Sequence, residues 1–242
     1  MSKRLFVKLQ RYGCRRYSHE ITQQRFKETM SRISSQAMIL TTSNMKGVTL
    51  GSVTSLSINP RPMVQFNLQV PSFTSQEIHK MKKFALHLMS PTQHSVNMAK
   101  LFSKGAIKGC NDEFVPTRPF DLLVEGKDYL MYDVECRATN PIPTIICEED
   151  AKIDWEKDEA LCNDTKVDAK SLSLPILTSA ERVIICESIR CFQVGDHEIW
   201  VGQVEEICSP DSGRVNEINK EQKTGGLVYF NRQFYKIGNP IV

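Results

Sequence analysis

The stretch "GVTLGSVTSLSINP", residues 47–60, constrains the fold of this chain more than any other. It alternates small and hydroxyl-bearing residues with aliphatic ones, as a strand does when one face is exposed. Two glycines, three serines and two threonines build a poor core. They do let a flat ligand approach the backbone, and they offer N–H, C=O and hydroxyl groups to its polar edges. The stretch therefore predicts either one wall of a ligand site or an edge strand kept soluble by its hydroxyls.

Strand patterns also dominate the rest of the chain. Apolar or alternating runs predict strands over residues 37–43, 63–70, 85–90, 128–138, 182–194 and 198–207, and a closing hairpin over 227–237 that turns at Asn231-Arg232. Helical spacing predicts a helix over residues 21–34, a short one after Thr74, and one from Thr92 to Gly105. Many strands with few helices indicate a mainly β fold, a β-barrel with peripheral helices.

Composition limits the classes of partner. The net charge of +3 and the hydrophobic content of 40% are ordinary for a globular protein. So small a charge does not indicate a nucleic-acid partner. No apolar run approaches the roughly 20 residues that a membrane-spanning helix needs. We therefore expect a soluble protein without a membrane span.

The first 17 residues carry most of the positive excess. They hold six basic residues, and no acidic residue precedes Glu20. A basic, amphipathic segment without acids is typical of a mitochondrial presequence. We therefore predict that residues 1–17 are removed, that the protein lies in the mitochondrial matrix, and that residues 18–242 form one domain. The alternative is a basic N-terminal arm without a targeting role.

One internal segment, at about residues 140–180, lacks periodicity. It is acidic in its middle and carries prolines at both ends. We interpret it as an insertion outside the barrel. It is either a solvated loop or a surface that binds a protein partner.

The eight cysteines are scattered. No Cys-x-x-Cys pair and no Cys/His grouping at zinc-finger spacing occurs. Cys186 and Cys191 are five residues apart, so a regular strand would point them to opposite faces. We predict reduced, structural thiols and assign no metal site.

Two further local patterns suggest a ligand site. Thr74 followed by Glu77 predicts a capping box, and the free N–H groups of a helix start, beside the hydroxyls of Ser72 and Thr74, attract a phosphate. Most capping boxes only cap. The second pattern is a hairpin that turns at Gly195-Asp196 and places His197 on one face with Ile199 and Val201. His197 is either a half-buried structural histidine or a site residue.

Four motifs, in the same order, resemble the flavin reductase-like family, whose fold is an FMN-binding split barrel. The family stretch Gly-x-Thr-x-x-Ser-x-x-Ser-x-Ser-x-Asp-Pro resembles residues 47–60, with Asn59 in place of the aspartate. The family's Ser-x-Thr at a helix start, its Gly-Asp-His-x-x-x-x-Gly-x-Val signature and its terminal tyrosine hairpin resemble residues 72–74, 195–204 and 227–237.

This resemblance implies an oxidoreductase that passes a hydride from NADH or NADPH to FMN. It also implies a homodimer with the flavin at the subunit interface. Ser72 and Thr74 would hold the phosphate. The flavin ring or ribityl chain would be contacted by Thr49, Ser52, Thr54 and Ser55. His197 would lie near the reaction face as a hydrogen-bond donor or cation, which suits the charge of reduced flavin.

Two alternative functions also remain open. Val70 stands where many members carry a basic residue that helps to hold the phosphate. That loss and the acidic segment suggest a split barrel without turnover, acting as a mitochondrial binding or assembly factor. A third alternative is a haem-binding barrel, in which His87, His94 or His197 would be the axial ligand.

Overall fold

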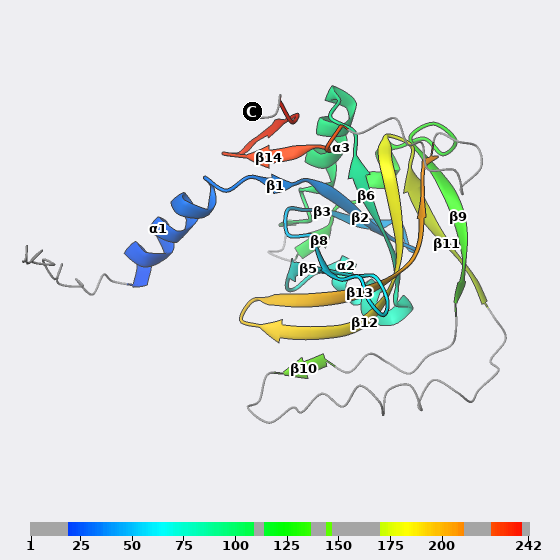
Figure 1. The fold of residues 1–242 in the computed structure, drawn as a ribbon, viewed down its shortest axis with the longest axis horizontal. Coiled ribbons are helices and arrows are strands. Elements are labelled where there is room, and N and C mark those ends of the chain that lie inside the picture. Colours follow the sequence, from blue (N-terminus) through cyan, green and yellow to red (C-terminus); the bar gives the residue numbers. More distant parts are fainter. Residues whose placement is uncertain (1–18, 109–113, 137–143, 147–169, 211–223, 239–242) are drawn as a thin grey trace, which may run out of the picture.

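The mainly β fold expected from the sequence is confirmed by the computed structural model, which describes residues 19–108, 114–136, 144–146, 170–210 and 224–238 (Figure 1). The predicted presequence lies outside these residues. The helices are α1 (His19–Met30), α2 (Phe73–Met81), α3 (Gln93–Phe102) and a 3₁₀ turn (Pro119–Leu122). The strands are β1 (Ser35–Gln36), β2 (Met38–Thr42), β3 (Lys46–Leu50), β4 (Thr54–Ser57), β5 (Met63–Gln69), β6 (Lys83–Met89), β7 (Ala106–Lys108), β8 (Phe114–Pro116), β9 (Tyr129–Cys136), β10 (Thr144–Ile146), β11 (Lys170–Leu177), β12 (Ala180–Val194), β13 (His197–Cys208), β14 (Val228–Phe230) and β15 (Gln233–Tyr235).

The main sheet has the strand order β3-β2-β6-β12-β13-β5-β4, and β10 pairs with β12 in parallel. Hydrogen bonding among the described strands thus gives an open sheet, not a closed barrel. Three residues, Gly51 to Val53, carry the chain from β3 to β4 outside either strand. There the Ser52 hydroxyl accepts a hydrogen bond from the backbone N–H of Asn67 on β5, at 3.1 Å. A side chain thus takes the place of a backbone acceptor from a neighbouring strand.

Alternate residues of this sheet face two different cores. Ile39, Ala85 and Ile185 belong to one apolar cluster, which also contains residues of β9, β11 and α3. Their sequence neighbours Leu40, Leu86 and Cys186 belong to a second cluster, which contains Ile78 of α2 and Trp200 of β13.

Gly202 has a packing role in the second core. A Cβ at this position would lie 2.5 Å from Cζ of Phe84. Only a residue without a side chain lets the aromatic ring pack against the backbone of β13. This contact gives a structural reason for the glycine in the Gly-Asp-His motif.

The predicted insertion over about residues 140–180 is wrong at its C-terminal end. Residues Lys170–Leu177 form β11, which pairs along its length with β9. Leu174 and Leu177 are fully buried. The stretch "KSLSLPIL" alternates as a strand should. Pro175 argued against a strand there, because proline is uncommon inside a sheet. Residues 147–169 lie outside the described part of the chain.

The two cysteines of β12 share one face, contrary to the spacing argument. Both Cys186 and Cys191 are buried in the second core. The register with β13 shifts between Ser188 and Arg190, so Ile189 is an extra residue in the strand. Such a bulge resets the alternation by one and brings residues five apart to the same side. Both thiols are free, as is that of Cys208.

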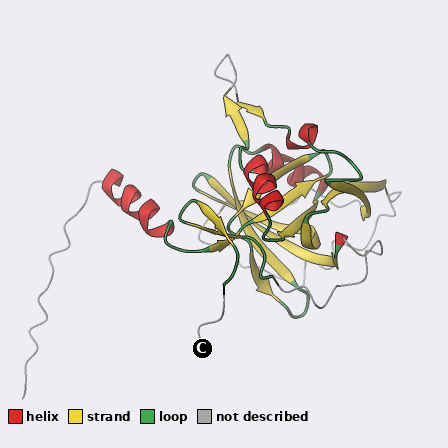
Figure 2. Cartoon of the chain, turned by 90° about the horizontal axis from the view of Figure 1, so that it is seen from above, coloured by secondary structure: helices red, strands yellow, loops and turns green. Residues whose placement is uncertain are grey.

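Helix α1 is confirmed, but it stands apart from the sheets in two perpendicular views (Figures 1 and 2). Its apolar side chains are therefore exposed, with Phe26 at 63%. The C-terminal hairpin is also confirmed: Asn231 and Arg232 both have positive φ, as a two-residue turn between twisted strands requires. Within the described chain, no helix combines the length and apolarity needed to cross a membrane.

Candidate functional site

The turn of the β12–β13 hairpin is fastened to the end of β5. Asp196 is held there twice: its carbonyl accepts from the N–H of Val70 at 2.9 Å, and its carboxylate accepts from Gln69 Nε2 at 3.3 Å. His197 pairs with Gln69 in the β13–β5 ladder. The residues that follow β5 lead directly into α2. The structure therefore places His197 beside the segment that carries Ser72 and Thr74.

His197 lies on the outer face of this sheet, as the alternation predicts. Ile199 pairs with exposed Asn67, whereas Trp200 pairs with buried Phe66 on the inner face. The imidazole is 41% exposed, and its Nδ1 lies 2.8 Å from Oδ1 of Asp196. This hydrogen bond is the main cause that lowers the pKa of the Asp196 carboxyl. The partner of the histidine is thus a carboxylate rather than a backbone carbonyl, and Nε2 is left for a ligand.

Strand β5 supplies polar groups to the same outer face that the sequence reasoning missed. Its buried and exposed residues alternate, so Gln65, Asn67 and Gln69 point outward together. Thr54 of β4 pairs with Gln65, and His197 of β13 pairs with Gln69. The signal was present in "MVQFNLQV", where every second residue from Gln65 to Gln69 carries an amide. The outer face of β5 is therefore polar, with Thr54 of β4 and His197 of β13 beside it and the aliphatic Ile199 and Val201 of β13 on the same face.

The start of α2 differs from the predicted capping box. Ser72, not Thr74, is the N-cap: its hydroxyl accepts from the N–H of Ser75 at 3.1 Å. Glu77 instead accepts a hydrogen bond from the side chain of Asn44. This tertiary contact occupies the Glu77 carboxylate, which the local sequence pattern predicted would cap the helix. Thr74 lies in the first turn and is only 6% exposed. The helix start leaves the N–H groups of residues 73 and 74 without an intrahelical acceptor.

The predicted hydroxyls of β3 and β4 do not all lie together. Thr49 donates its hydroxyl to the carbonyl of Ala99 at 2.7 Å, which fastens β3 to α3. Ser55 pairs with buried Val64, so it points to the opposite face from Thr54. The structure thus places Ser52 and Thr54 beside β5, next to Asn67 and Gln65 respectively. It places Thr49 in a structural contact.

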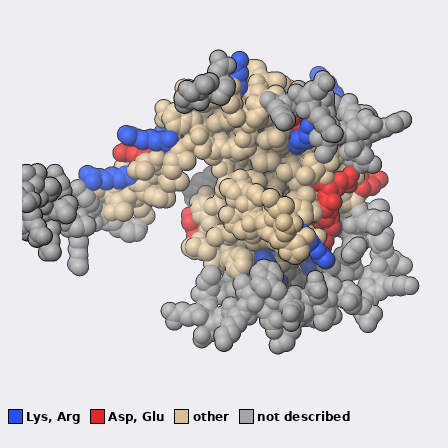
Figure 3. All heavy atoms as spheres, viewed as in Figure 1, with Lys and Arg blue, Asp and Glu red and all other residues tan. Residues whose placement is uncertain are grey.

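A polar pocket of about 290 Å³ lies elsewhere, and none of the predicted site residues lines it. The buried ammonium of Lys83 lies 3.0 Å from Glu187 and 2.6 Å from Glu205. Burial raises the pKa of Glu205. Acidic side chains also gather on the surface formed by β9 and β11 in Figure 3. A pocket that already holds its own counter-ion is best explained as a structural ion cluster.

Comparison with known proteins shows that most of the chain matches one protein family. Residues 30–124 and 147–238 match the flavin reductase like domain. Among solved structures, the flavin reductase HpaC complexed with NADP⁺ is 19% identical, with a TM-score of 0.53 over 89% of this chain and 97% of that one. The styrene monooxygenase flavin reductase SMOB from Pseudomonas putida S12 is 16% identical, with a TM-score of 0.52 over 90% and 99%.

A third similar structure is the NADH:FAD oxidoreductase SgcE6 of Streptomyces globisporus C-1027, in complex with NAD and FAD fragments. It is 15% identical, with a TM-score of 0.53 over 90% of this chain and 93% of that one. At these identities the structures show a shared fold. The family match covers more than half of the sequence, so the chain belongs to the flavin reductase like domain family.

Proposed function

We propose that this member of the flavin reductase like domain family is a mitochondrial FMN-binding oxidoreductase that passes a hydride from NADH or NADPH to flavin. The observation that carries the proposal is the fastening of the Gly195-Asp196 turn to the end of β5. That contact puts His197, the start of α2 and the polar face of β5 in one region. A site for an anionic, polar-edged cofactor needs these three parts together.

The start of α2 fits a phosphate. No acidic residue lies in its first turn, and the Ser72 hydroxyl uses an acceptor lone pair, not its proton, to cap Ser75. The N–H groups of residues 73 and 74 and the hydroxyl of Thr74 complete a set of donors at the positive end of the helix dipole. Since Val70 adds no positive charge, backbone and hydroxyl donors would have to hold the phosphate without a cation from that position.

The outer face of β4 and β5 fits the polar edge of the ring. Asn67 and Gln69 carry both donors and acceptors, and Ser52 and Thr54 add hydroxyls. Flavin, when bound, supplies the hydride chemistry itself. Thr49 and Ser55 are weaker candidates, because one hydroxyl already bonds Ala99 and the other points to the opposite face.

His197 would act on the charge of the reduced state. Its Nδ1 donates to the Asp196 carboxylate, which fixes the ring and leaves Nε2 to accept a hydrogen bond when the ring is neutral, or to donate one as the imidazolium. A donor or cation directed at developing negative charge is worth about 10²–10³ in rate in comparable sites. His197 is the residue for which we propose a catalytic role.

A homodimer would account for the exposed helix α1. Ile21, Phe26, Met30 and Ile33 leave large apolar surfaces uncovered in one chain. Such surfaces on a soluble protein are usually covered by a partner. We expect a dimer by sedimentation, and monomers for the double variant Phe26→Glu/Met30→Glu. Residues 1–17 would direct the chain to the matrix, and the acidic segment would be open to a protein partner.

The direct test is a titration of the purified protein with FMN, and with FAD in parallel, followed by absorbance. A flavin spectrum that bleaches on addition of NADH or NADPH is expected. Thr74→Glu places a carboxylate at the phosphate position and should abolish binding. Gln93→Glu, at the exposed start of α3, adds the same charge elsewhere and should bind normally.

Three outcomes would reject parts of the proposal. A folded dimer that ignores both flavins would reject the oxidoreductase and favour the binding or assembly factor. Equal flavin affinity in Thr74→Glu would show that the phosphate site is elsewhere. His197→Ala should bind flavin while losing about 10²-fold in hydride transfer. An unchanged rate would leave His197 a structural residue of the turn.

A further inference from the structure

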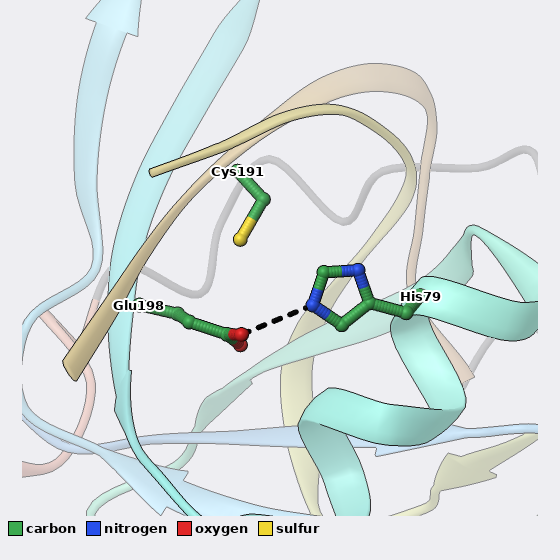
Figure 4. A group of neighbouring side chains, drawn as sticks. All are labelled: His79, Cys191 and Glu198. Atoms are coloured by element: carbon green, nitrogen blue, oxygen red, sulfur yellow. Dashed lines mark hydrogen bonds and ion pairs between the residues drawn. The ribbon is translucent and has the colours of Figure 1, made fainter. Parts of the chain in front are cut away.

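A second group of ligand-type side chains lies beneath α2, on the inner face of the β12–β13 hairpin. Glu198 pairs with Gln193 and Trp200 pairs with Cys191, so Cys191 and Glu198 are diagonal neighbours on one face. Helix α2 covers this face with His79 and Ser75, which are one turn apart. Three separate elements thus direct an imidazole, a thiol and a carboxylate to one point (Figure 4).

The distances are close to those of a coordination site. Nε2 of His79 lies 3.1 Å from Oε1 of Glu198, and the ligand atoms of His79, Glu198 and Cys191 all lie within 4.8 Å of one another. In a tetrahedral zinc site with bonds of about 2.0–2.3 Å, ligand atoms are separated by about 3.3–3.6 Å. The His79–Glu198 separation is already close to this range, and the Cys191 sulfur lies within 4.8 Å of both ligand atoms. Figure 4 shows the sulfur of Cys191 directed toward the gap beside the His79–Glu198 pair.

We propose that His79, Cys191 and Glu198 bind a Zn²⁺ ion. Imidazole, thiolate and carboxylate are the three ligand types that zinc takes in proteins, and one thiolate with one carboxylate balances its charge. On binding, the Cys191 proton passes to solvent and the sulfur bonds the metal. The side chains of His79 and Glu198 are 29% and 12% exposed, which leaves an entry path and a fourth position for water.

The surroundings also suit a metal. The hydroxyl of Ser75 donates to the second oxygen of Glu198, an outer contact that orients a ligating carboxylate. The ring of Trp200 packs on His79 at 4.5 Å and restricts its orientation. An ion pair between His79 and Glu198 would explain those two residues alone. It would not explain why a third ligand type is buried beside them.

Zinc here would have a structural consequence. The ion would join α2 to both strands of the hairpin, and Glu198 directly follows His197 in the sequence. It would hold the start of α2 and the hairpin turn in a fixed relation. The metal site does not depend on flavin binding, so each can be tested without the other.

The test uses the full chain, reduced, stripped of metal with a chelator and titrated with Co²⁺ as a spectroscopic probe, then with Zn²⁺. One equivalent of cobalt should give a thiolate-to-metal charge-transfer band and intense visible bands of tetrahedral coordination, both abolished by zinc. Cys191→Ala should remove the charge-transfer band and weaken zinc binding by more than about 100-fold, since outer-shell changes alone cost about 10–100-fold. Ser75→Ala should fall in that lower range.

The matched control is Cys186→Ala, which removes a buried thiol from the same strand and the same apolar cluster. It should bind one equivalent with an unchanged spectrum. If Cys191→Ala does not fold, His79→Gln, at a partly exposed position, tests the same site. No stoichiometric binding by the parent protein, or a thiolate band that persists in Cys191→Ala, would overturn the proposal. A flavin titration of the stripped protein shows whether flavin binding survives independently.

Discussion

His87 makes stability depend on pH in a calculable way. Its imidazole is fully buried on β6; Nδ1 bonds the carbonyl of Ile39 at 2.9 Å, and Nε2 has no hydrogen-bond partner. A proton on Nε2 would therefore create a buried cation with an unsatisfied donor. Burial lowers the pKa of His87 from 6.5 to about 4, more than the hydrogen bond to Ile39 raises it.

The sign follows from proton linkage. Between about pH 4 and pH 6.5 the unfolded chain binds a proton at this histidine and the folded protein does not, so the unfolding free energy rises with pH. The stabilisation is complete above the unfolded value and is lost as the pH falls toward the folded one. The two pKa values correspond to about 3 kcal/mol in total, of which about 2 kcal/mol is lost between about pH 8 and pH 5.

The assay is urea unfolding of the parent protein and of His87→Asn at several values across this range. Asparagine can still donate to the Ile39 carbonyl but does not titrate. We expect the unfolding free energy of the variant to fall by about 2 kcal/mol less than that of the parent over this range. Replacing exposed His94 with asparagine is the control, and it should keep the parent's pH dependence. Parallel pH profiles for the parent and His87→Asn would refute the reasoning.

Two further predictions concern packing, and both are measured as changes in urea unfolding free energy. Gly202→Ala should destabilise the fold by about 1–3 kcal/mol, because the added Cβ would lie 2.5 Å from the Phe84 ring; Gly238→Ala, which meets no atom within 4 Å, should change stability by less than about 0.5 kcal/mol. Leu174→Ala should cost about 2–5 kcal/mol if β11 belongs to the core, whereas exposed Leu122→Ala should cost little. A Leu174→Ala value near that of Leu122→Ala would return β11 to the predicted insertion.

Several features of the fold could be predicted because their signals are local. A two-residue turn with glycine, or with an asparagine that tolerates positive φ, specifies a hairpin within a few residues. Both hairpins were placed correctly at Gly195-Asp196 and Asn231-Arg232. The face of His197 followed from alternation alone. Helix α3 was predicted from its cap, and Thr92 is indeed the N-cap.

Other predictions failed where a distant contact changed a local rule. The predicted capping box does not form, because the Glu77 carboxylate accepts a hydrogen bond from Asn44 instead. The prediction that Cys186 and Cys191 point to opposite faces was wrong, because an extra residue in β12 shifts the alternation. No sequence pattern indicated that bulge. The hydroxyl of Thr49 looked free in a strand pattern but bonds the carbonyl of Ala99, fifty residues away.

By itself, the sequence determined the strand-rich class and the hairpins, and it supplied some of the polar candidates for a flavin site. These depend on side-chain period and turn chemistry, which act over a few residues. Only the tertiary structure decided which of those residues share a face. Pairing of strands far apart in the chain joins Asp196 to the end of β5 and directs His79, Cys191 and Glu198 toward one point. Such groupings depend on register between distant segments, and a register shift of one residue would move each side chain to the other face.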